Sequence, residues 1–222
     1  MRFRELKKIV FQLLDSSDFP KGLEEILRLP PKEAVNPLFS FFHNRNELVK
    51  WRAVTAMGAV VSRLADQEKE AARIVMRRLI WNLNDESGGI GWGSPEAMGE
   101  IMARHPGLAN EYHKILTSYI MPEGNYLEHE ILQRGVLWGI GRLAHERPEL
   151  VESSVGYLIP FMHSHDPFLR GLAAWIAILF NSPETNGLLK KMRDDQAVFT
   201  LYTDNRLNDV TVSSIAWLKT GA

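Results

Sequence analysis

Residues 49–58 read VKWRAVTAMG, and a similar order of small and apolar residues returns three more times along the chain. The later copies begin at residues 90, 132 and 169, so successive starts are 41, 42 and 37 residues apart. The third copy has Gly139 where the first has Ala56, and the fourth lacks the terminal glycine. Recurrence at a period of about forty residues indicates a protein made of stacked structural repeats.

A second helical pattern precedes each copy of this segment. Apolar residues recur at helical spacing over residues 32–42, 67–83, 107–120 and 148–161. Turn sequences that contain proline separate these patterns, and Pro160 falls inside the last one, where we expect a kink. The chain is therefore predicted to consist of two-helix repeats, which bury their apolar faces by stacking on one another.

The period, the small residues and the glycine that ends three copies resemble the second helix of HEAT-like repeats of the PBS-lyase type. This resemblance implies an all-α fold, namely a right-handed, armadillo-like α-solenoid of helical hairpins. It also implies a scaffold that binds another protein or a peptide on its concave face. We expect one continuous domain, with capping helices in residues 1–30, HEAT-like repeats in residues 31–182 and a distinct C-terminal segment in residues 183–222.

Both ends of the chain depart from the repeat. Residues 3–14 and 21–29 have the pattern of a helical hairpin that caps the stack. Residues 197–202 and 207–212 are rich in β-branched and aromatic residues and flank a turn sequence, which predicts a small β-hairpin; a helix over residues 212–218 follows. An isolated hairpin is only marginally stable. It must pack on its own chain or on a second copy in a homodimer, and the sequence leaves both open.

The composition is typical of a folded, soluble protein. Of the 222 residues, 45% are hydrophobic and 24% are charged, which argues against the disordered, collagen-like and membrane-embedded classes. The chain has no cysteine, which excludes disulfides, thiol nucleophiles, zinc ribbons and iron–sulfur clusters. We find no secretory signal and no apolar stretch long enough to cross a membrane, so we expect a cytoplasmic protein without a membrane span.

Charge is distributed unevenly along the chain. Residues 1–83 carry 15 Lys and Arg against 10 Asp and Glu, residues 84–152 carry 5 against 11, and residues 153–222 carry 6 against 6. Phosphate binding needs clustered Lys and Arg, which displace counterions from the nucleic acid. The acidic middle of the chain therefore argues against a nucleic-acid partner.

A glycine-rich segment interrupts the second repeat, with four glycines in six residues from Gly88 to Gly93. Each glycine inside a helix costs about 1 kcal/mol relative to alanine, so the segment is predicted to be a loop. Ser94 as N-cap, followed by Pro95 and Glu96, would restart the helix. Such a loop can hold a ligand, and its carboxylates favour a peptide, a cation or a basic surface over a phosphate; alternatively it is a tight corner with Trp92 in the core. The candidate ligand-loop residues are Asn84, Asp85, Glu86, Gly88, Gly89, Gly91 and Gly93.

Polar residues at the start of the third copy form a second candidate group. Glu130 and Arg134 are four residues apart and can pair on one helix face. Stacking of the repeats would bring this turn beside Glu96 and Glu100, and together with His129 such a group could hold a divalent metal. No two histidines have the spacing of a helical metal site. No metal and no cofactor is therefore predicted.

Trp138 and Trp175 occupy the same position of their copies, where the other copies have Thr55 and Glu96. Residues that recur in register on stacked helices line one side of a solenoid. Two tryptophans there can anchor a peptide or stack on a base, or they can fill core gaps beside neighbouring glycines. The candidate partner-binding residues are Trp92, Glu96, Glu100, Glu128, His129, Glu130, Arg134, Trp138, Arg170 and Trp175.

The sequence favours a non-catalytic scaffold or adaptor, because it contains no complete set of catalytic residues. The resemblance leaves two enzyme classes as alternatives. HEAT-like alkylpurine DNA glycosylases use Trp, Asp and Arg on a basic concave surface, which the acidic central repeats oppose. HEAT-like phycobilin lyases attach a chromophore to a carrier protein, and nothing beyond the repeat itself supports that activity. The glycine-rich segment lacks the lysine and the preceding strand of a phosphate-binding loop, so nucleotide binding is not predicted.

Overall fold

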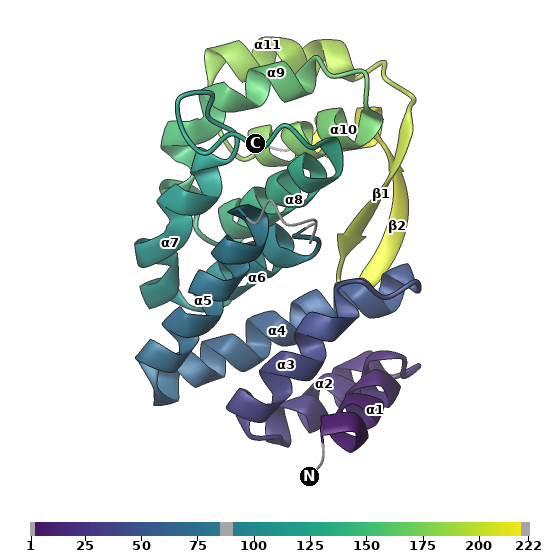
Figure 1. Cartoon of the computed structure of the whole chain (residues 1–222). Coiled ribbons are helices and arrows are strands. Elements are labelled where there is room, and N and C mark those ends of the chain that lie inside the picture. The colour runs from purple at the N-terminus through teal and green to yellow at the C-terminus, as the bar shows by residue number, and fades with distance from the viewer. Residues whose placement is uncertain (1–2, 85–90, 219–222) are drawn as a thin grey trace.

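The chain folds into a stack of helices with a short β-hairpin along one side (Figure 1). The computed structural model describes residues 3–84 and 91–218. The α-helices are α1 (Phe3–Leu14), α2 (Phe19–Arg28), α3 (Pro31–Phe41), α4 (Glu47–Gln67), α5 (Lys69–Asn84), α6 (Ser94–Arg104), α7 (Pro106–Ser118), α8 (Glu130–Glu146), α9 (Ile159–Met162), α10 (Pro167–Ala177), α11 (Pro183–Met192) and α12 (Val212–Trp217). Two 3-10 helices, η1 (Pro148–Leu150) and η2 (Glu152–Leu158), precede α9, and the strands are β1 (Val198–Thr203) and β2 (Arg206–Thr211).

The repeated segment forms four helices that lie next to one another in chain order, namely α4, α6, α8 and α10. We call them the second helices. The first helices α3, α5 and α7 pack against this row, which confirms the predicted two-helix repeat for the first three copies. The predicted N-terminal helical hairpin is also present: α1 and α2 contact each other, and both contact α4.

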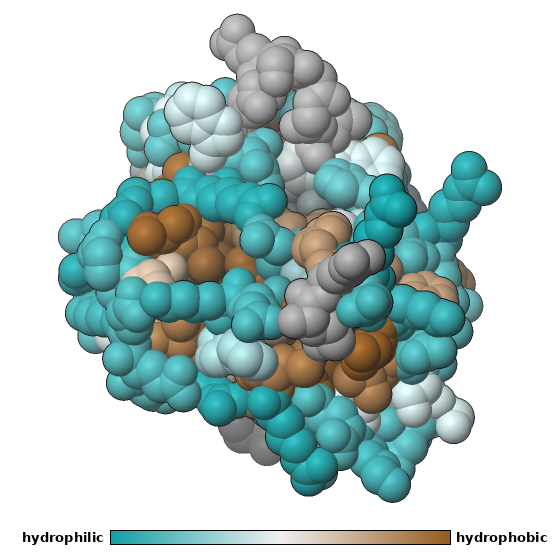
Figure 2. Space-filling model, turned by 60° about the horizontal axis from the view of Figure 1, so that its bottom comes forward, coloured by the Kyte–Doolittle hydropathy of each residue, from teal (hydrophilic) through white to brown (hydrophobic). Residues whose placement is uncertain are grey.

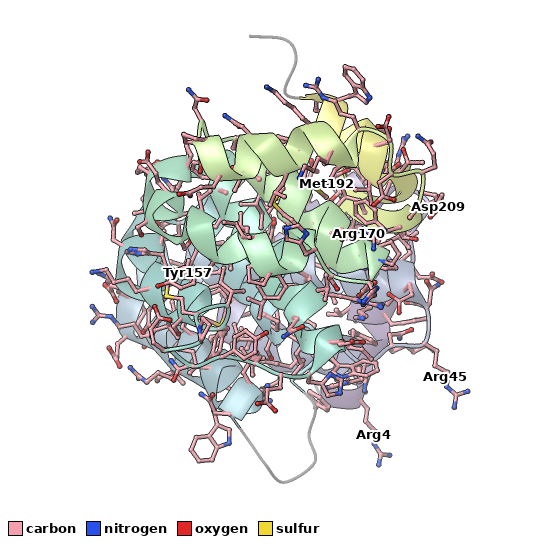
Figure 3. All side chains as sticks on the ribbon, turned by 90° about the horizontal axis from the view of Figure 1, so that it is seen from above. Arg4, Arg45, Tyr157, Arg170, Met192 and Asp209 are labelled. Carbon is pink, nitrogen blue, oxygen red and sulfur yellow. The ribbon has the colours of Figure 1, made fainter. Side chains whose placement is uncertain are left out.

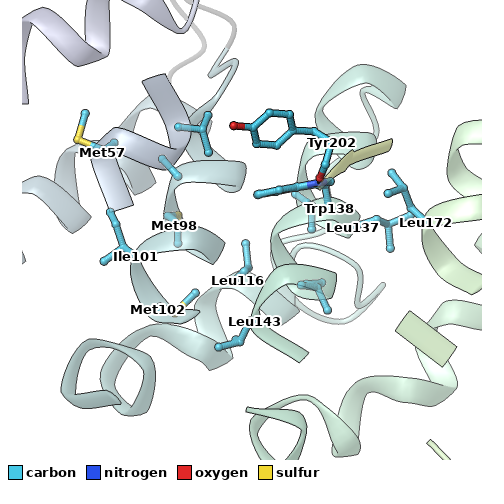
Figure 4. Packing of buried hydrophobic residues seen from close by; sticks show 14 of the residues in the cluster. Met57, Met98, Ile101, Met102, Leu116, Leu137, Trp138, Leu143, Leu172 and Tyr202 are labelled. Atoms are coloured by element: carbon cyan, nitrogen blue, oxygen red, sulfur yellow. The ribbon is translucent and has the colours of Figure 1, made fainter. Parts of the chain in front are cut away.

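Small residues bring two of the second helices very close together. A Cβ atom added at Gly99 of α6 would collide with the backbone of Gly139 in α8. Buried apolar residues surround this contact, including Met98 and Ile101 of α6 and Leu137 of α8 (Figure 4). The glycine that the repeat retains in α6 is thus required by the close packing of two backbones.

Two local predictions were wrong. Residues 148–161 do not form one α-helix but are divided into η1, η2 and α9. Pro148 and Pro160 lie in the first turns of η1 and α9, and a proline has no N–H to donate within a continuous helix. The cap of α6 is Gly93, not Ser94; Gly93 has a φ of 76°, and Ser94 is the buried first residue of the helix.

The predicted hairpin and the helix after it are confirmed. β1 pairs with β2 in antiparallel register, with Val198 opposite Thr211. Asp204 and Asn205 connect the strands with φ angles of 51° and 61°. A two-residue turn with both central residues at positive φ matches the twist of the strands, and Asp and Asn adopt this conformation more readily than most other residues.

The hairpin packs on its own chain. The ring of Phe199 in β1 is buried in front of Gly171 in α10, where any side chain would collide with it. Phe168 of α10 contacts the same ring edge-on, with the two ring centroids 5.9 Å apart. Of the two interpretations that the sequence left open, intrachain packing is therefore present; homodimerisation through the hairpin stays a prediction.

The surface is mostly hydrophilic, and apolar side chains are exposed in small areas between the polar ones (Figure 2). Phe3, Ile9 and Phe11 of α1 are among the large apolar residues that reach solvent. Within residues 3–84 and 91–218, no helix is both long enough and apolar enough to cross a bilayer.

Replacing Gly99 with alanine should separate α6 from α8. We expect the free energy of unfolding to fall by about 1–3 kcal/mol, the usual cost of overpacking a core. Gly187→Ala is the matched control: Gly187 lies inside α11 and a Cβ atom there meets nothing within 4 Å, so this variant should be as stable as the wild type or slightly more so. Urea denaturation of both variants measures the difference, and equal effects would contradict the packing argument.

Candidate functional site

The β-hairpin lies across the second helices and reaches from α10 to α4 (Figure 1). Tyr202 of β1 makes the contacts at the far end. Its hydroxyl is 2.9 Å from the hydroxyl of Thr55 in α4, and its backbone oxygen accepts a 3.0 Å hydrogen bond from the indole nitrogen of Trp138 in α8. Its ring stacks on Trp51 of α4, with the centroids 5.0 Å apart. Burial raises the pKa of Tyr202 to about 12, so this hydroxyl keeps its proton at neutral pH.

This contact changes the role of the two predicted aromatic anchors. Trp138 and Trp175 lie on the side of the helices that the hairpin covers, but they are only 3% and 6% exposed. Trp138 packs against Trp51 at 4.7 Å between ring centroids, and Trp175 stacks on His145 at 4.6 Å. The sequence left two interpretations of this pair open, and their burial favours the one in which they fill the core: a Cβ atom added at Gly141 would collide with the ring of Trp175.

Two pockets border the hairpin, and Trp138 lines both of them. We call the first the aromatic pocket; its volume is about 410 Å³. We call the second the charged pocket; its volume is about 770 Å³. The aromatic pocket is lined by Glu47, Lys50, Trp51, Trp92, Glu96, Ile131, Arg134, Gly135, Trp138, Phe168, Leu172, Thr200 and Leu207. Residues that line the charged pocket include Glu100, Arg104, Trp138, Arg142, His145, Glu146, Trp175, Tyr202, Asn205 and Asn208.

The carboxyl group of Glu96 distinguishes the aromatic pocket chemically. The side chain is 7% exposed and lies against Gly135 of α8, where an added Cβ atom would be 2.7 Å from the carboxyl carbon. Its Oε2 atom has no hydrogen-bond partner among the described residues. Burial raises the pKa of Glu96, whereas the positive charge of Lys50 and hydrogen bonds to the backbone of Glu96 and Gly93 act in the opposite direction. A buried acceptor without a partner is costly.

Trp92, which lines the same pocket, has a buried donor without a partner among the described residues. The indole nitrogen of Trp92 has no acceptor among the described residues. The ammonium group of Lys50 lies 5.5 Å from the centroid of the Trp92 ring and 3.7 Å from a carboxylate oxygen of Glu47, so it is not hydrogen-bonded to Glu96. Most buried polar groups in proteins have a partner. One free donor and one free acceptor in a pocket therefore indicate a place where a ligand or ordered water binds.

Arg134 has a different partner from the one predicted. Its guanidinium pairs with Asp166 at 2.7 Å, and not with Glu130. Glu128, His129 and Glu130 are exposed around the start of α8. In the part of the chain that the structure describes, no three His, Asp or Glu side chains form a group that could hold a metal ion.

Glu100 lies one helical turn after Glu96 and is fully paired. Its two carboxylate oxygens accept hydrogen bonds from Arg104 at 2.6 Å and from Arg142 at 2.7 Å. Arg142 also pairs with Glu146 at 2.8 Å. Removing one member of such a buried network leaves the others unpaired. We therefore assign Glu100 a structural role in joining α6 to α8.

Arg170 is likewise held by its own chain. It pairs with Asp195 at 2.8 Å and donates to the backbone oxygens of Ser164 and His165. In Figure 3 it lies against the ribbon, whereas Arg4 and Arg45 project away from it. The Asp195 side chain also accepts from the backbone of Ala197, so this pair fixes α10 to the segment that enters the hairpin.

The predicted ligand loop is described only at its ends. Asn84 donates to the backbone oxygen of Ile80, and Gly91 lies so close to the backbone of Asn82 that an added Cβ atom would be 2.6 Å from its oxygen. Gly93 is the cap of α6. Asp85, Glu86, Gly88 and Gly89 lie outside the described residues.

Several residues of the aromatic pocket were not predicted. Trp51, Trp92 and Arg134 share the third position of the first three copies, four residues before the position that we had singled out. Residues four apart lie on the same face of a helix, so extending the register comparison to this position would have identified Trp51. Phe168 and Leu207 enter the pocket through tertiary packing, and no pattern in the sequence indicates this.

The sequence matches a known protein over part of its length. No protein-family model matches the chain. An uncharacterized protein of Archaeoglobus fulgidus is 31% identical over 111 residues, which cover 48% of this chain and 52% of that protein. The chain thus spans about half the length of the curated relative that it matches.

Solved structures with a similar fold include designed armadillo repeat proteins and other engineered proteins. One engineered protein aligns with a TM-score of 0.55 at 11% identity, covering 99% of this chain and 97% of its own. A designed armadillo repeat protein aligns with a TM-score of 0.51 at 14% identity, covering 96% and 98%. Another, in complex with the peptide (KR)4, aligns with a TM-score of 0.50 at 17% identity, covering 97% and 98%. At these identities the similarity shows an armadillo-like helical repeat fold.

Glu96→Gln should stabilise the protein, and more so at higher pH. Burial raises the pKa of Glu96, so folding is penalised once the pH rises above the pKa of the carboxyl in the unfolded chain. Glutamine has a similar shape and cannot ionise. The glutamine amide is still a buried polar group, so the gain comes only from removing the buried charge. We expect it to be about 1 kcal/mol or more near pH 8, where that charge is penalised, and smaller near pH 5.

Thermal denaturation at the two pH values measures this gain, with Glu33→Gln as the control. Glu33 is the third residue of α3, as Glu96 is of α6, but it is exposed. A stability difference between Glu96→Gln and wild type that does not grow with pH would contradict the assignment.

Proposed function

We propose that this chain is a non-catalytic interaction protein that binds a peptide segment of a partner protein in the aromatic pocket. The observation that carries the proposal is the pair of unpartnered buried groups, the Oε2 atom of Glu96 and the indole nitrogen of Trp92, in a pocket with aromatic walls. A peptide offers apolar side chains, backbone donors and backbone acceptors together, which is what such a pocket can satisfy.

The location of the pocket differs from the one that the sequence suggested. The hairpin covers part of the second helices through Tyr202, so a partner would bind beside the hairpin and not along the full length of these helices. Of the predicted partner-binding residues, the aromatic pocket contains Trp92, Glu96, Arg134 and Trp138. The likeness to a designed armadillo protein in complex with a peptide is compatible with this proposal.

Membership of the HEAT-like lyase-type family, the right-handed sense of the superhelix and a cytoplasmic location stay predictions. The two enzyme alternatives gain no support from the pockets. A DNA glycosylase of this architecture needs an open basic surface. In this chain Glu96 lines one pocket, Glu100 lines the other, and the hairpin lies between the two pockets. The charged pocket contains arginines, but Arg104 and Arg142 are both paired with Glu100.

Selection of a displayed library of random peptides tests the proposal. Ile131 is 43% exposed at the rim of the aromatic pocket, so Ile131→Lys should block entry without disturbing the core. Ile74 is 58% exposed on α5 and does not line this pocket, so Ile74→Lys is the matched control. We expect selected peptides to bind the wild type and the control equally, and Ile131→Lys about tenfold more weakly.

Two results would contradict the proposed function. One is that no peptide is enriched over an empty support. The other is that the enriched peptides bind Ile131→Lys as tightly as Ile74→Lys, which would place the binding surface elsewhere.

A further inference from the structure

We infer that the aromatic pocket recognises an arginine residue of the partner peptide, with the guanidinium on Glu96 and a backbone carbonyl of the peptide on Trp92. This inference rests on the proposed function and specifies its ligand. It follows from the types of the two unpartnered groups and from the walls around them.

The acceptor calls for a cationic donor. Oε2 of Glu96 is buried and has no donor among the described residues; Arg134 pairs with Asp166, and Lys50 acts on Glu96 through its charge without an ion pair. A guanidinium donates several hydrogen bonds in one plane and pairs well with carboxylates. It therefore supplies the donor that Oε2 of Glu96 lacks.

The walls of the pocket suit a planar cation. Trp51, Trp92, Trp138 and Phe168 provide aromatic surface, and arginine stacks on aromatic rings more readily than lysine does. The protein already uses this contact in the pocket: the guanidinium of Arg134 lies 4.5 Å from the centroid of the Phe168 ring. The stem of an entering arginine would cover the apolar surface of Leu172.

The unpartnered donor calls for a different part of the ligand. The indole N–H of Trp92 needs an acceptor, and a guanidinium has none. The backbone carbonyl of the same or an adjacent peptide residue can accept this hydrogen bond. An arginine within a peptide thus satisfies both groups, whereas a free organic cation satisfies only one.

Protonation of the pocket should oppose binding. Burial raises the pKa of Glu96, and a protonated carboxyl no longer attracts a cation. The other charged groups that line the pocket are Glu47 and Lys50 of α4 and Arg134 of α8; the pocket residues of α10 and of the hairpin carry no charge. Binding should therefore be tighter near pH 8 than near pH 5.

Small amides of arginine test the inference without any partner. The probe is N-acetyl-arginine methylamide, which carries the guanidinium and two carbonyls. N-acetyl-citrulline methylamide has nearly the same shape without the charge, and methylguanidinium lacks the carbonyls. The signal is the indole N–H resonance of Trp92 in a ¹⁵N-labelled sample, assigned by its loss in Trp92→Phe.

We expect the arginine amide to shift the Trp92 resonance with a dissociation constant in about the millimolar range, and both other compounds to bind about tenfold more weakly or not at all. Glu96→Gln should weaken binding of the arginine amide by about tenfold or more, whereas Glu33→Gln should not change it. The lysine amide should bind more weakly than the arginine amide.

Equal binding of the arginine and citrulline amides, equal affinity of Glu96→Gln and wild type, or an unmoved Trp92 resonance would overturn the inference. These outcomes are separable from those of the peptide selection. Peptides that depend on Ile131 but contain no arginine would uphold the proposed function and reject this ligand. Binding of the arginine amide without any enriched peptide would reject the proposed function and uphold the arginine site.

Discussion

The contact of Tyr202 with α4 and α8 determines what the rest of the molecule can do. This one residue joins positions that are far apart in the sequence: its hydroxyl meets Thr55, its ring stacks on Trp51, and its backbone oxygen accepts from Trp138. Through these contacts the hairpin crosses the second helices and divides their exposed side into two pockets. A helical repeat protein would otherwise offer one continuous surface. Here the available binding sites are smaller, and each is enclosed in part by the hairpin.

Two glutamates of α6 show how this arrangement assigns different roles to the same residue type. Glu100 accepts from Arg104 and Arg142 and thereby joins neighbouring helices. Glu96, one turn earlier, is equally buried but keeps one oxygen without a partner. The first arrangement joins two helices, whereas the second leaves a buried carboxyl whose ionisation is opposed by burial. Such a group retained in a pocket with aromatic walls is explained most directly by a ligand that pairs with it.

The sequence predicted the fold well where the information is local or periodic. The repeat located the second helices, and the turn residues Asp204 and Asn205 between two β-branched segments located the hairpin. The apolar spacing of residues 148–161 predicted one helix, whereas Pro148 and Pro160 divide this segment into shorter helices.

The candidate site could be predicted only in part. Glu96 and Trp138 were identified because they share one position of the repeat, Trp92 because it lies in the glycine-rich segment, and Arg134 because it follows the polar turn of the third copy. The position of the hairpin across the helices was not predicted, because it depends on contacts such as that of Tyr202 with Thr55, which no local pattern encodes. For the same reason the partner of Arg134 was predicted as Glu130, four residues away in sequence, and is Asp166, which the next repeat brings closer.

The central claim is that the hairpin lies across the second helices, and a nuclear Overhauser measurement between aromatic rings tests it most directly. In a sample with labelled Tyr and Trp rings, the ring protons of Tyr202 should show cross-peaks to those of Trp51, because the two centroids are 5.0 Å apart. Assignment follows from the loss of these peaks in Tyr202→Leu. A Tyr202 ring without cross-peaks to Trp51 would mean that the hairpin does not reach α4, and the division of the surface into two pockets would be wrong.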